Sequence, residues 1–506
     1  MEPEASQPGA GHGPPQDVAV SVPINWDSDY RNPRNWSLWR KTAVTAIVSI
    51  IGFVCTMAAS IYTPGADQVA SEMHVSTAVS LLPLSFYNLG MAFGPIISSP
   101  LSETFGRKAV YLTTLPPFAL FTLGAGFSQD ISSLIVCRFF AGTFGAPGVS
   151  IASATIADIC APVNRAIPLS FYYAVPFVGS LSGVLIGGYV VESKGWRWTQ
   201  WTVLFFTVVT LSSIIFVRES YKKIIYQRLE GVPVGDRAAA KSDFLKEFQY
   251  FLTKTIIRPI HMLFTEPIVG FVCLYASFQF ALLYTFVVAS PHIFQTTYGF
   301  SLGTQGLTFL GFIVGVSLST IPIIVFDRLL YQRKFAQFTH THALTPSAPS
   351  SPSSPSLGTT NPTDPTTTEF PPEHRLYSPM LGSLLLPLGL FLFAWTTHPS
   401  IPALIPILFQ GLTIFGSLLV YAGANMYMMD TYGPLYGASA TGASSLSRYT
   451  LSAAFPLFAL PMYEALGTGW ATSVLAFGTV AMAPIPWVFW WWGPGLRARS
   501  GYERSV

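Results

Sequence analysis

The sequence predicts an all-α integral membrane protein with twelve membrane-spanning helices, and three observations carry this prediction. Half of the 506 residues are hydrophobic and only 10% are charged, with a mean hydropathy of +0.46, which is too apolar for a soluble chain of this length. Apolar runs recur along the chain, and each is long enough to cross a hydrocarbon core of about 30 Å. All but four of the 27 Lys and Arg residues fall on one face of the resulting arrangement.

The expected spans follow from the apolar runs. They cover residues 42–63, 79–99, 109–127, 131–154, 167–190, 201–217, 267–290, 303–326, 379–396, 402–422, 436–462 and 470–492. Of the four exceptional basic residues, Lys194 and Arg197 lie on the opposite face, whereas Arg138 and Arg448 lie inside spans. Because basic loops stay on the cytosolic side, this distribution places both termini in the cytosol and requires an even number of spans.

A charged segment divides the spans into two groups of six. We expect a disordered cytosolic tail at 1–41, a first six-helix half at 42–217, a cytosolic linker at 218–266, a second half at 267–492 and a cytosolic tail at 493–506. Residues 343–372 are rich in Pro, Ser and Thr and are expected to form a disordered insert. Two halves of six helices predict internal pseudo-symmetry, with a substrate site between them.

Residues 90–108 join the second and third spans through a short charged loop. Gly90 and Gly94 lie four residues apart and allow a neighbouring helix to approach closely. Glu103, Arg107 and Lys108 follow at once, between two apolar runs. We expect Glu103 and Arg107 to pair, or to hold helix ends, in a contact that forms in one conformation of the protein and breaks in another. A loop that merely caps a helical hairpin is the alternative.

The segment at 100–108, Pro-Leu-Ser-Glu-Thr-Phe-Gly-Arg-Lys, resembles the loop 2–3 signature of the major facilitator superfamily, in the form found in fungal drug:proton antiporters. Further landmarks that are similar to the family occur in order at 26–36, 60–65, 196–199, 218–221 and 430–433. The resemblance extends over most of residues 26–495. It implies the major facilitator fold, with two pseudo-symmetric six-helix halves. It also implies gating roles for Gly94, Glu103, Gly106, Arg107 and Lys108.

Arg138 lies about seven residues into the fourth expected span. A charge at that depth costs about 3 kcal/mol unless it faces a cavity or finds partners, so it is by default a functional hypothesis. The surrounding residues resemble the family's fourth-span motif, whose arginine is associated with proton coupling. A structural arginine bonded to main-chain carbonyls is the alternative. For Arg448, the second buried cation, structural and anion-sensing roles are both open.

The evidence for proton exchange within the spans is mixed. No Asp or Glu falls in the middle of any expected span, although an intramembrane carboxylate is the usual proton carrier of an antiporter. Ser180 and Val184 replace two prolines of the family's antiporter motif in the fifth span. The glycines of that motif, which serve equally well for tight packing, are Gly179, Gly183, Gly187 and Gly188.

Several polar or aromatic side chains inside or close to spans are candidates for a substrate cavity. They are Tyr62, Tyr87, Asn88, Tyr173, Gln279, Tyr284, Asn425 and Arg448. A largely apolar cavity with few polar anchors suits amphipathic or planar organic molecules. Ordinary packing between helices is the alternative for each of these residues.

The resemblance implies a monomeric secondary transporter of the plasma membrane that exports drugs, toxins or secondary metabolites by alternating access. Its expected partners are a small-molecule substrate, protons and the lipid bilayer, with the proton gradient as energy source and no cofactor. An uncoupled facilitator or organic-anion carrier of the same fold is one alternative, and a receptor or scaffold that transports nothing is another. The sequence has no phosphate-binding, HExxH or GxSxG signature and no metal cluster, so we expect no enzyme, no catalytic or metal-binding residues and no nucleic-acid partner.

Overall fold

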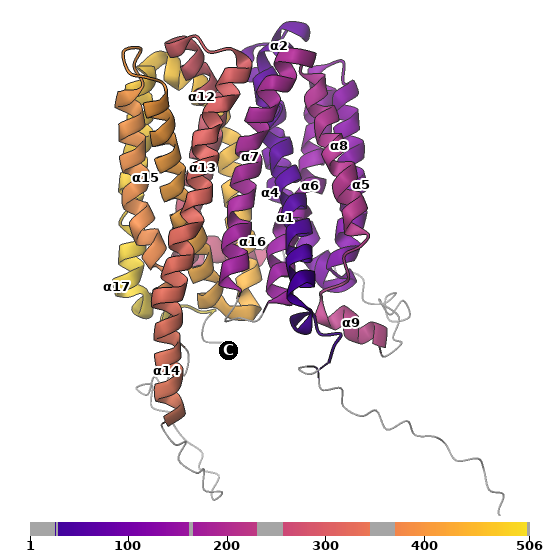
Figure 1. Ribbon diagram of the computed structural model, residues 1–506, viewed down its shortest axis with the longest axis vertical. Helices are drawn as coiled ribbons and strands as arrows, with labels where there is room; N and C mark the ends of the chain where they lie inside the picture. Colours follow the sequence, from indigo (N-terminus) through magenta and orange to yellow (C-terminus); the bar gives the residue numbers. More distant parts are fainter. Residues whose placement is uncertain (1–25, 27–28, 161–164, 230–256, 345–369, 503–506) are drawn as a thin grey trace, which may run out of the picture.

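The computed structural model describes residues 26, 29–160, 165–229, 257–344 and 370–502. Within these ranges the chain forms helices and their connections, without strands. The long helices stand side by side in one bundle (Figure 1). Residues 230–256 of the expected linker, 345–369 of the expected insert, and 1–25 and 27–28 of the expected N-terminal tail lie outside the described residues.

The first half of the bundle contains six long helices. They are α1 (Leu38–Ser60), α4 (Leu82–Phe105), α5 (Arg107–Phe127), α6 (Ile131–Ile159), α7 (Ala166–Lys194) and α8 (Arg197–Ile214). Short elements precede α1 and join it to α4, namely η1 (Pro33–Asn35), η2 (Thr63–Gly65), α2 (Ala66–Glu72) and α3 (Thr77–Ser80).

The second half begins with α12 (Pro267–Tyr298) and α13 (Leu302–Phe326). It continues with η5 (Pro372–Arg375), α15 (Tyr377–Thr396), α16 (Leu404–Met482) and α17 (Ile485–Arg497). The backbone of α16 leaves the helical conformation at Gly433 and Gly467, which have φ of 57° and 73°. Because positive φ is accessible to glycine at little cost, these two residues turn the chain and divide α16 into three membrane passes.

The number of passes agrees with the twelve that the sequence predicts. Ten helical segments of the described residues are long and apolar enough to cross a membrane, and one of them, Ser439–Arg497, contains two passes separated at Gly467. The remaining pass is α8, whose mean hydropathy is reduced by Arg197 and Gln200 in its first turn. The predicted twelve-helix fold is therefore confirmed.

Both ends of the described chain lie on one face of the bundle, together with α9 (Lys222–Leu229), α11 (Arg258–Thr265) and α14 (Gln332–Leu344) (Figure 1). We call this the terminal face, and the opposite face, where α2 lies, the far face. The eighth pass is longer than its predicted end at residue 326, because it continues through the π-helical turn η4 (Asp327–Tyr331) into α14. The stretch 327–344 contains neither glycine nor proline, so nothing in it stops the helix.

The predicted close approach at Gly90 and Gly94 is confirmed, and the approaching helix is α6. A Cβ atom on Gly90 would lie 2.2 Å from the Phe139 carbonyl oxygen, and one on Gly142 would lie 2.1 Å from the Tyr87 carbonyl oxygen. The backbones of α4 and α6 are thus in direct contact, which is how helices associate where lipid provides no hydrophobic driving force.

Replacing Gly90 by alanine should therefore force α4 and α6 apart. We expect Gly90→Ala to lower the free energy of unfolding by about 1–3 kcal/mol, seen as a lower melting temperature of the purified chain. Gly495 is exposed in α17 and has no atom within 4 Å of an added Cβ, so Gly495→Ala is the matched control. Equal melting temperatures for the two variants would contradict the packing argument.

Candidate functional site

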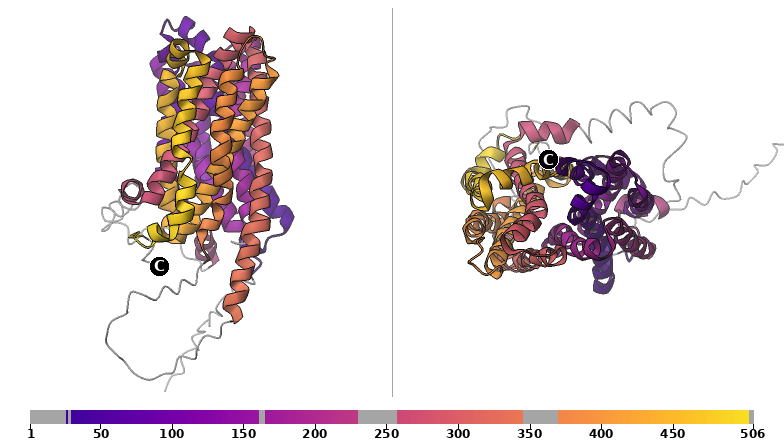
Figure 2. Two further views of the ribbon diagram at one scale, coloured as in Figure 1. Left: turned by 90° about the vertical axis from the view of Figure 1, so that its left-hand side faces the viewer. Right: turned by 90° about the horizontal axis from the view of Figure 1, so that it is seen from above.

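The two halves meet mainly through α7 of the first half, which packs against α13 and touches α16 of the second, and through α4, which packs against α16. Seen from above in Figure 2, the first half (indigo to magenta) and the second half (orange to yellow) stand side by side. Contacts between the halves occur at three levels, near the far face, in the middle and near the terminal face.

Near the far face, α7 and α13 are joined by a hydrogen bond and by glycine packing. The backbone N–H of Gly303 donates to Glu192 Oε2 at 2.9 Å, which places a carboxylate at the N-terminus of α13, where its charge is favoured. A Cβ atom on Gly188 would lie 2.6 Å from the Leu302 carbonyl oxygen. The halves are therefore in contact at this face.

In the middle, aromatic rings of both halves interlock. The Phe177 ring lies 4.9 Å from the Phe280 ring and 5.4 Å from the Tyr421 ring, measured between centroids. The Ser180 hydroxyl lies 3.4 Å from the Tyr284 hydroxyl. Ser180 stands where the family's antiporter motif has a proline, and its side chain makes a hydrogen bond between the halves that proline cannot make.

Near the terminal face, a chain of ion pairs joins the halves. Arg165 at the start of α7 donates to Asp430 Oδ1 at 2.8 Å, and Asp430 Oδ2 accepts from Arg375 at 2.8 Å. Arg375 also donates to Asp327 at 2.7 Å. Burial acts to lower the pKa of Arg375, but the carboxylates of Asp430 and Asp327 outweigh it and raise that pKa above its ordinary value. The halves are thus linked at both faces.

Between these links lies an inter-half cavity of about 60 Å³. Its walls come from α4, α6 and α7 on one side and from α16 on the other. The polar and aromatic lining residues are Ser99, Ser150, Ser153, Tyr172, Tyr173, Tyr421, Asn425, Thr441, Ser444, Ser445, Arg448 and Tyr449. Among the described residues that line it, Arg448 is the single charged one.

Arg448 lines the cavity, and aromatic side chains surround its guanidinium. Its guanidinium lies 4.4 Å from the Phe280 ring centroid, 4.7 Å from that of Tyr449 and 5.2 Å from that of Tyr421. It also donates a hydrogen bond to the Tyr421 hydroxyl. Two of the predicted cavity residues lie beside it in the cavity wall, namely Tyr173 and Asn425. The expected end of the tenth span at residue 422 was too early, because the helix continues to Gly433.

Arg138 is held within the first half. It donates to the carbonyl oxygens of Ala58 at 2.8 Å and Ala59 at 2.9 Å, at the C-terminal end of α1, where a helix favours a cation. Its guanidinium also lies 4.5 Å from the Tyr87 ring centroid and 5.5 Å from that of Tyr62. This is the geometry of the structural alternative, and a role in proton coupling stays a prediction.

The other predicted cavity residues lie away from the inter-half cavity. The hydroxyls of Tyr62 and Tyr87 donate to the carbonyls of Ser80 and Cys55, both at 2.7 Å. Asn88 is fully buried, and neither polar atom of its amide has a hydrogen-bond partner in the part of the chain that the structure describes.

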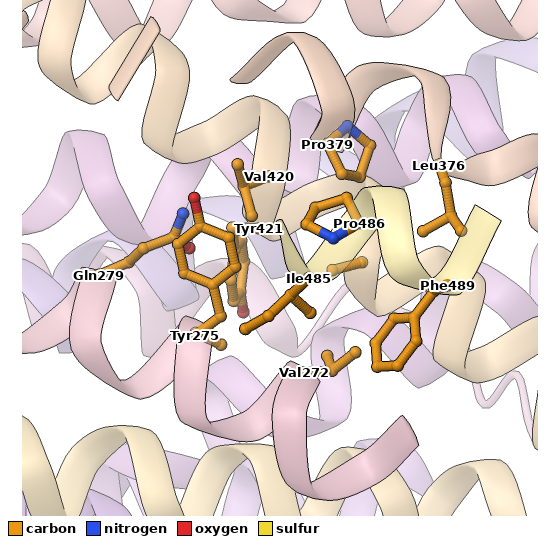
Figure 3. A pocket seen from close by; sticks show the side chains of 12 residues that line it. Val272, Tyr275, Gln279, Leu376, Pro379, Val420, Tyr421, Ile485, Pro486 and Phe489 are labelled. Atoms are coloured by element: carbon orange, nitrogen blue, oxygen red, sulfur yellow. The ribbon is translucent and has the colours of Figure 1, made fainter. Parts of the chain in front are cut away.

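Gln279 lines a second, smaller pocket of about 10 Å³ inside the second half. Figure 3 shows Tyr275, Gln279 and Tyr421 grouped at one side of this pocket, and apolar side chains such as Phe489 at the other. Within the described ranges, the Gln279 amide and the Tyr275 hydroxyl have no hydrogen-bond partner.

The expected pairing of Glu103 with Arg107 is wrong for this conformation. Arg107 pairs with Asp158 of α6 at 3.1 Å. The helix α4 ends before Gly106, which has φ of 98°, and Arg107 starts α5, so the four-residue spacing of Glu103 and Arg107 does not place them on one helix face.

Glu219, which the sequence analysis did not single out, holds the loop between α4 and α5 instead. Its carboxylate accepts from the backbone N–H groups of Arg107 at 2.9 Å and Lys108 at 3.1 Å, so it caps the N-terminus of α5. A Cβ atom on Gly106 would lie 2.4 Å from Glu219 Oε2, which explains why glycine is required there.

The glycines of α7 serve two interfaces. Added Cβ atoms on Gly179, Gly183 and Gly187 would lie 2.1–2.4 Å from atoms of α1 or the residue after it, whereas Gly188 faces α13. The packing interpretation therefore accounts for all four in this conformation.

The sequence analysis missed four aromatic residues of the inter-half contact. They are Phe177, Phe280, Tyr421 and Tyr449. Tyr449 adjoins Arg448 in the sequence, and Tyr421 lies one helical turn before Asn425. Both tyrosines could therefore have been identified from their spacing to these polar candidates. Nothing in the local sequence pattern distinguishes Phe177 or Phe280, which are buried between the halves, from phenylalanines that face lipid.

A twelve-helix bundle whose halves touch at both faces and enclose a cavity between them has the architecture of a secondary transporter. The family model described as Major Facilitator Superfamily matches residues 48–456, and the chain belongs to this family. It is thus an integral, multi-pass membrane transporter of small molecules and not an enzyme, which confirms the resemblance seen in the sequence.

Three similar proteins illustrate the range of the family. Polyamine transporter 4 of Saccharomyces cerevisiae is 34% identical over 95% of this chain and 73% of its own. Efflux pump FUB11 of Gibberella moniliformis is 34% identical over 94% of this chain and 77% of its own. The proton:xylose symporter XylE shares the fold, with a TM-score of 0.61 over 90% of this chain and 96% of its own, at 14% identity.

The ion pair between Arg165 and Asp430 should hold the terminal face closed. Its side chains are 28% and 15% exposed, so we expect a contribution of about 0.2–1 kcal/mol. Arg165→Gln should accordingly raise the rate at which an impermeant maleimide labels Ser445→Cys in the cavity wall from this face, by about 1.4- to fivefold. The parent chain without the introduced cysteine gives the background, and Arg333→Gln, on exposed α14, is the control variant. An unchanged labelling rate would show that this pair does not control access.

Proposed function

We propose that the chain exports small organic molecules by alternating access, in exchange for protons, from a cell whose cytosol holds both of its termini. The observation that carries this proposal is the position of the inter-half cavity between breakable links, with Arg165–Asp430 near one face and Glu192–Gly303 at the other. Two relatives with 34% identity named as an efflux pump and a polyamine transporter support transport of organic molecules.

The transport cycle would break these links in turn. Parting of Arg165 from Asp430 would open the cavity to the cytosol at the terminal face, where substrate enters. Parting of Glu192 from Gly303 would open it on the far face, where substrate leaves. The interlocking rings of Phe177 and Phe280 would close again after each passage. The plasma membrane is the location at which such a cycle removes a compound from the cell.

Energy would come from the proton gradient, without a further cofactor. We assign proton coupling to Arg138, because it is a buried cation whose Nε atom has no hydrogen-bond partner among the described residues. A shift in the position of the carbonyl groups that Arg138 binds at the end of α1 would also move α7, because α7 packs directly on α1.

An uncoupled carrier of the same fold is the second candidate. Within the described residues, the buried carboxylates lie beside helix ends, as Glu219 and Glu266 do, or near the terminal face, as Asp327 does. Ser180 also replaces a proline of the antiporter motif. A carboxylate in the middle of a span and the motif proline usually accompany proton exchange, so both observations favour the uncoupled carrier.

Efflux from transporter-deficient yeast cells expressing the chain separates the two candidates. With a panel of fluorescent compounds and organic acids, we expect efflux that a protonophore abolishes and that Arg138→Ala lowers at least about tenfold. Arg138→Lys, which keeps the charge, and Arg333→Gln, at an exposed position, are the comparison variants, each checked for equal amounts in the membrane. Efflux that continues with protonophore and in Arg138→Ala would favour the uncoupled carrier.

A further inference from the structure

The chemistry of the inter-half cavity selects among substrates by charge. Arg448 is 5% exposed and lies near the middle of the second pass of α16. The described residues that line the cavity include no carboxylate to neutralise it. An arginine buried in this way is costly unless a partner is present during part of the cycle.

The hydrogen bonds of Arg448 are incomplete. An arginine side chain has five N–H donors, and the acceptor that Arg448 finds among the described residues is the Tyr421 hydroxyl, while its Nε atom has no partner. Its other close neighbours are the Phe280 ring and Tyr449, whose ring faces attract the charge but accept no conventional hydrogen bond. Arg138 donates to two carbonyl oxygens instead, although its Nε atom also has no partner among the described residues.

Two further hydroxyls lie beside Arg448 in this wall. Those of Ser444 and Tyr449 are buried and donate to no oxygen or nitrogen atom of the described residues, and their polar neighbours include the Cys273 thiol and the Arg448 guanidinium. Ser444 precedes Arg448 by one helical turn, so the two side chains lie on the same side of α16. Three buried groups capable of donating hydrogen bonds thus lie in one wall of the cavity, and the described lining offers them the Tyr421 hydroxyl as an oxygen acceptor, which Arg448 already uses.

The group that fits this wall is a carboxylate. Its two oxygens accept several hydrogen bonds at once, and its planar shape matches the fork of a guanidinium. The surrounding rings, among them Tyr172 and Tyr173 of the first half and Tyr421 of the second, offer flat apolar surfaces to the rest of the molecule. An aromatic acid combines both features.

We propose that the substrates of this transporter are organic anions, in particular aromatic carboxylates, and that the carboxylate binds to Arg448, Ser444 and Tyr449. The inference rests on the proposed function for transport through the inter-half cavity, but not on its coupling to protons. Cations such as polyamines are disfavoured, although one relative is named a polyamine transporter, because they would meet a positive charge with no carboxylate beside it. A cavity of about 60 Å³ receives the carboxylate end alone, so the halves must part to admit the whole molecule.

Thermal stability of the purified full-length chain in detergent tests this assignment. The probes are benzoate, its neutral counterpart benzamide and the cation spermidine, at neutral pH and equal ionic strength. We expect benzoate to raise the melting temperature of the wild-type chain, and the other two to leave it unchanged. In Arg448→Gln the half-maximal benzoate concentration should rise at least about tenfold, and in Ser444→Ala it should rise less. Arg333→Gln, which removes an exposed positive charge on α14, should behave as wild type.

Three results would overturn the proposal. They are a benzoate response no larger than that of benzamide, a response retained in Arg448→Gln, and a shift with spermidine. Should Arg448→Gln not fold, the comparison of benzoate with benzamide on wild type and the response of Ser444→Ala still decide the question. Because binding in detergent needs neither a gradient nor a direction, its result is independent of whether efflux proves to be coupled to protons.

Discussion

The contact of α7 with α1 is the interaction on which the rest of the structure depends. Lipid does not drive helices together, so the pair must be held by direct backbone contact, which Gly179, Gly183 and Gly187 permit. The opposite side of α7 touches the second half at all three levels, from Arg165 to Glu192. One side of the helix therefore packs tightly on its own half, while the other contacts the second half through glycine packing at Gly188, hydrogen bonds and aromatic rings.

Two buried arginines show how the same charge is accommodated in different ways. Arg138 uses carbonyl oxygens at the end of α1, a position where the helix already carries partial negative charge. Arg448 lies between aromatic rings and one hydroxyl, in a wall of the cavity. The first arrangement uses two carbonyl acceptors and fixes α6 on α1. The second leaves N–H groups of Arg448 without acceptors, so these groups are available to bind a ligand.

The sequence was sufficient for the twelve passes because hydropathy and basic loops depend on lipid and water alone. Partners distant along the chain could not be predicted in this way. The tenth span was expected to end at residue 422. Its helix continues through Asp430, because Arg165 and Arg375 from two other segments neutralise the charge of that aspartate. Arg107 likewise finds Asp158 rather than the nearby Glu103, and the rings of Phe177 and Phe280 meet only when both halves have folded.

Anionic substrates would also reconcile export with the missing intramembrane carboxylates. Moving one elementary charge across a membrane potential is worth about 2.3 kcal/mol per 100 mV. An anion that leaves a cell with a negative interior moves down this potential, and a proton that enters moves charge in the same electrical sense. Exchange of one for the other therefore gains about twice that energy, and even uncoupled export of the anion is favoured. A cation would have to leave against the potential, and the substrate cavity of such an exporter would need the negative charge that the lining around Arg448 lacks.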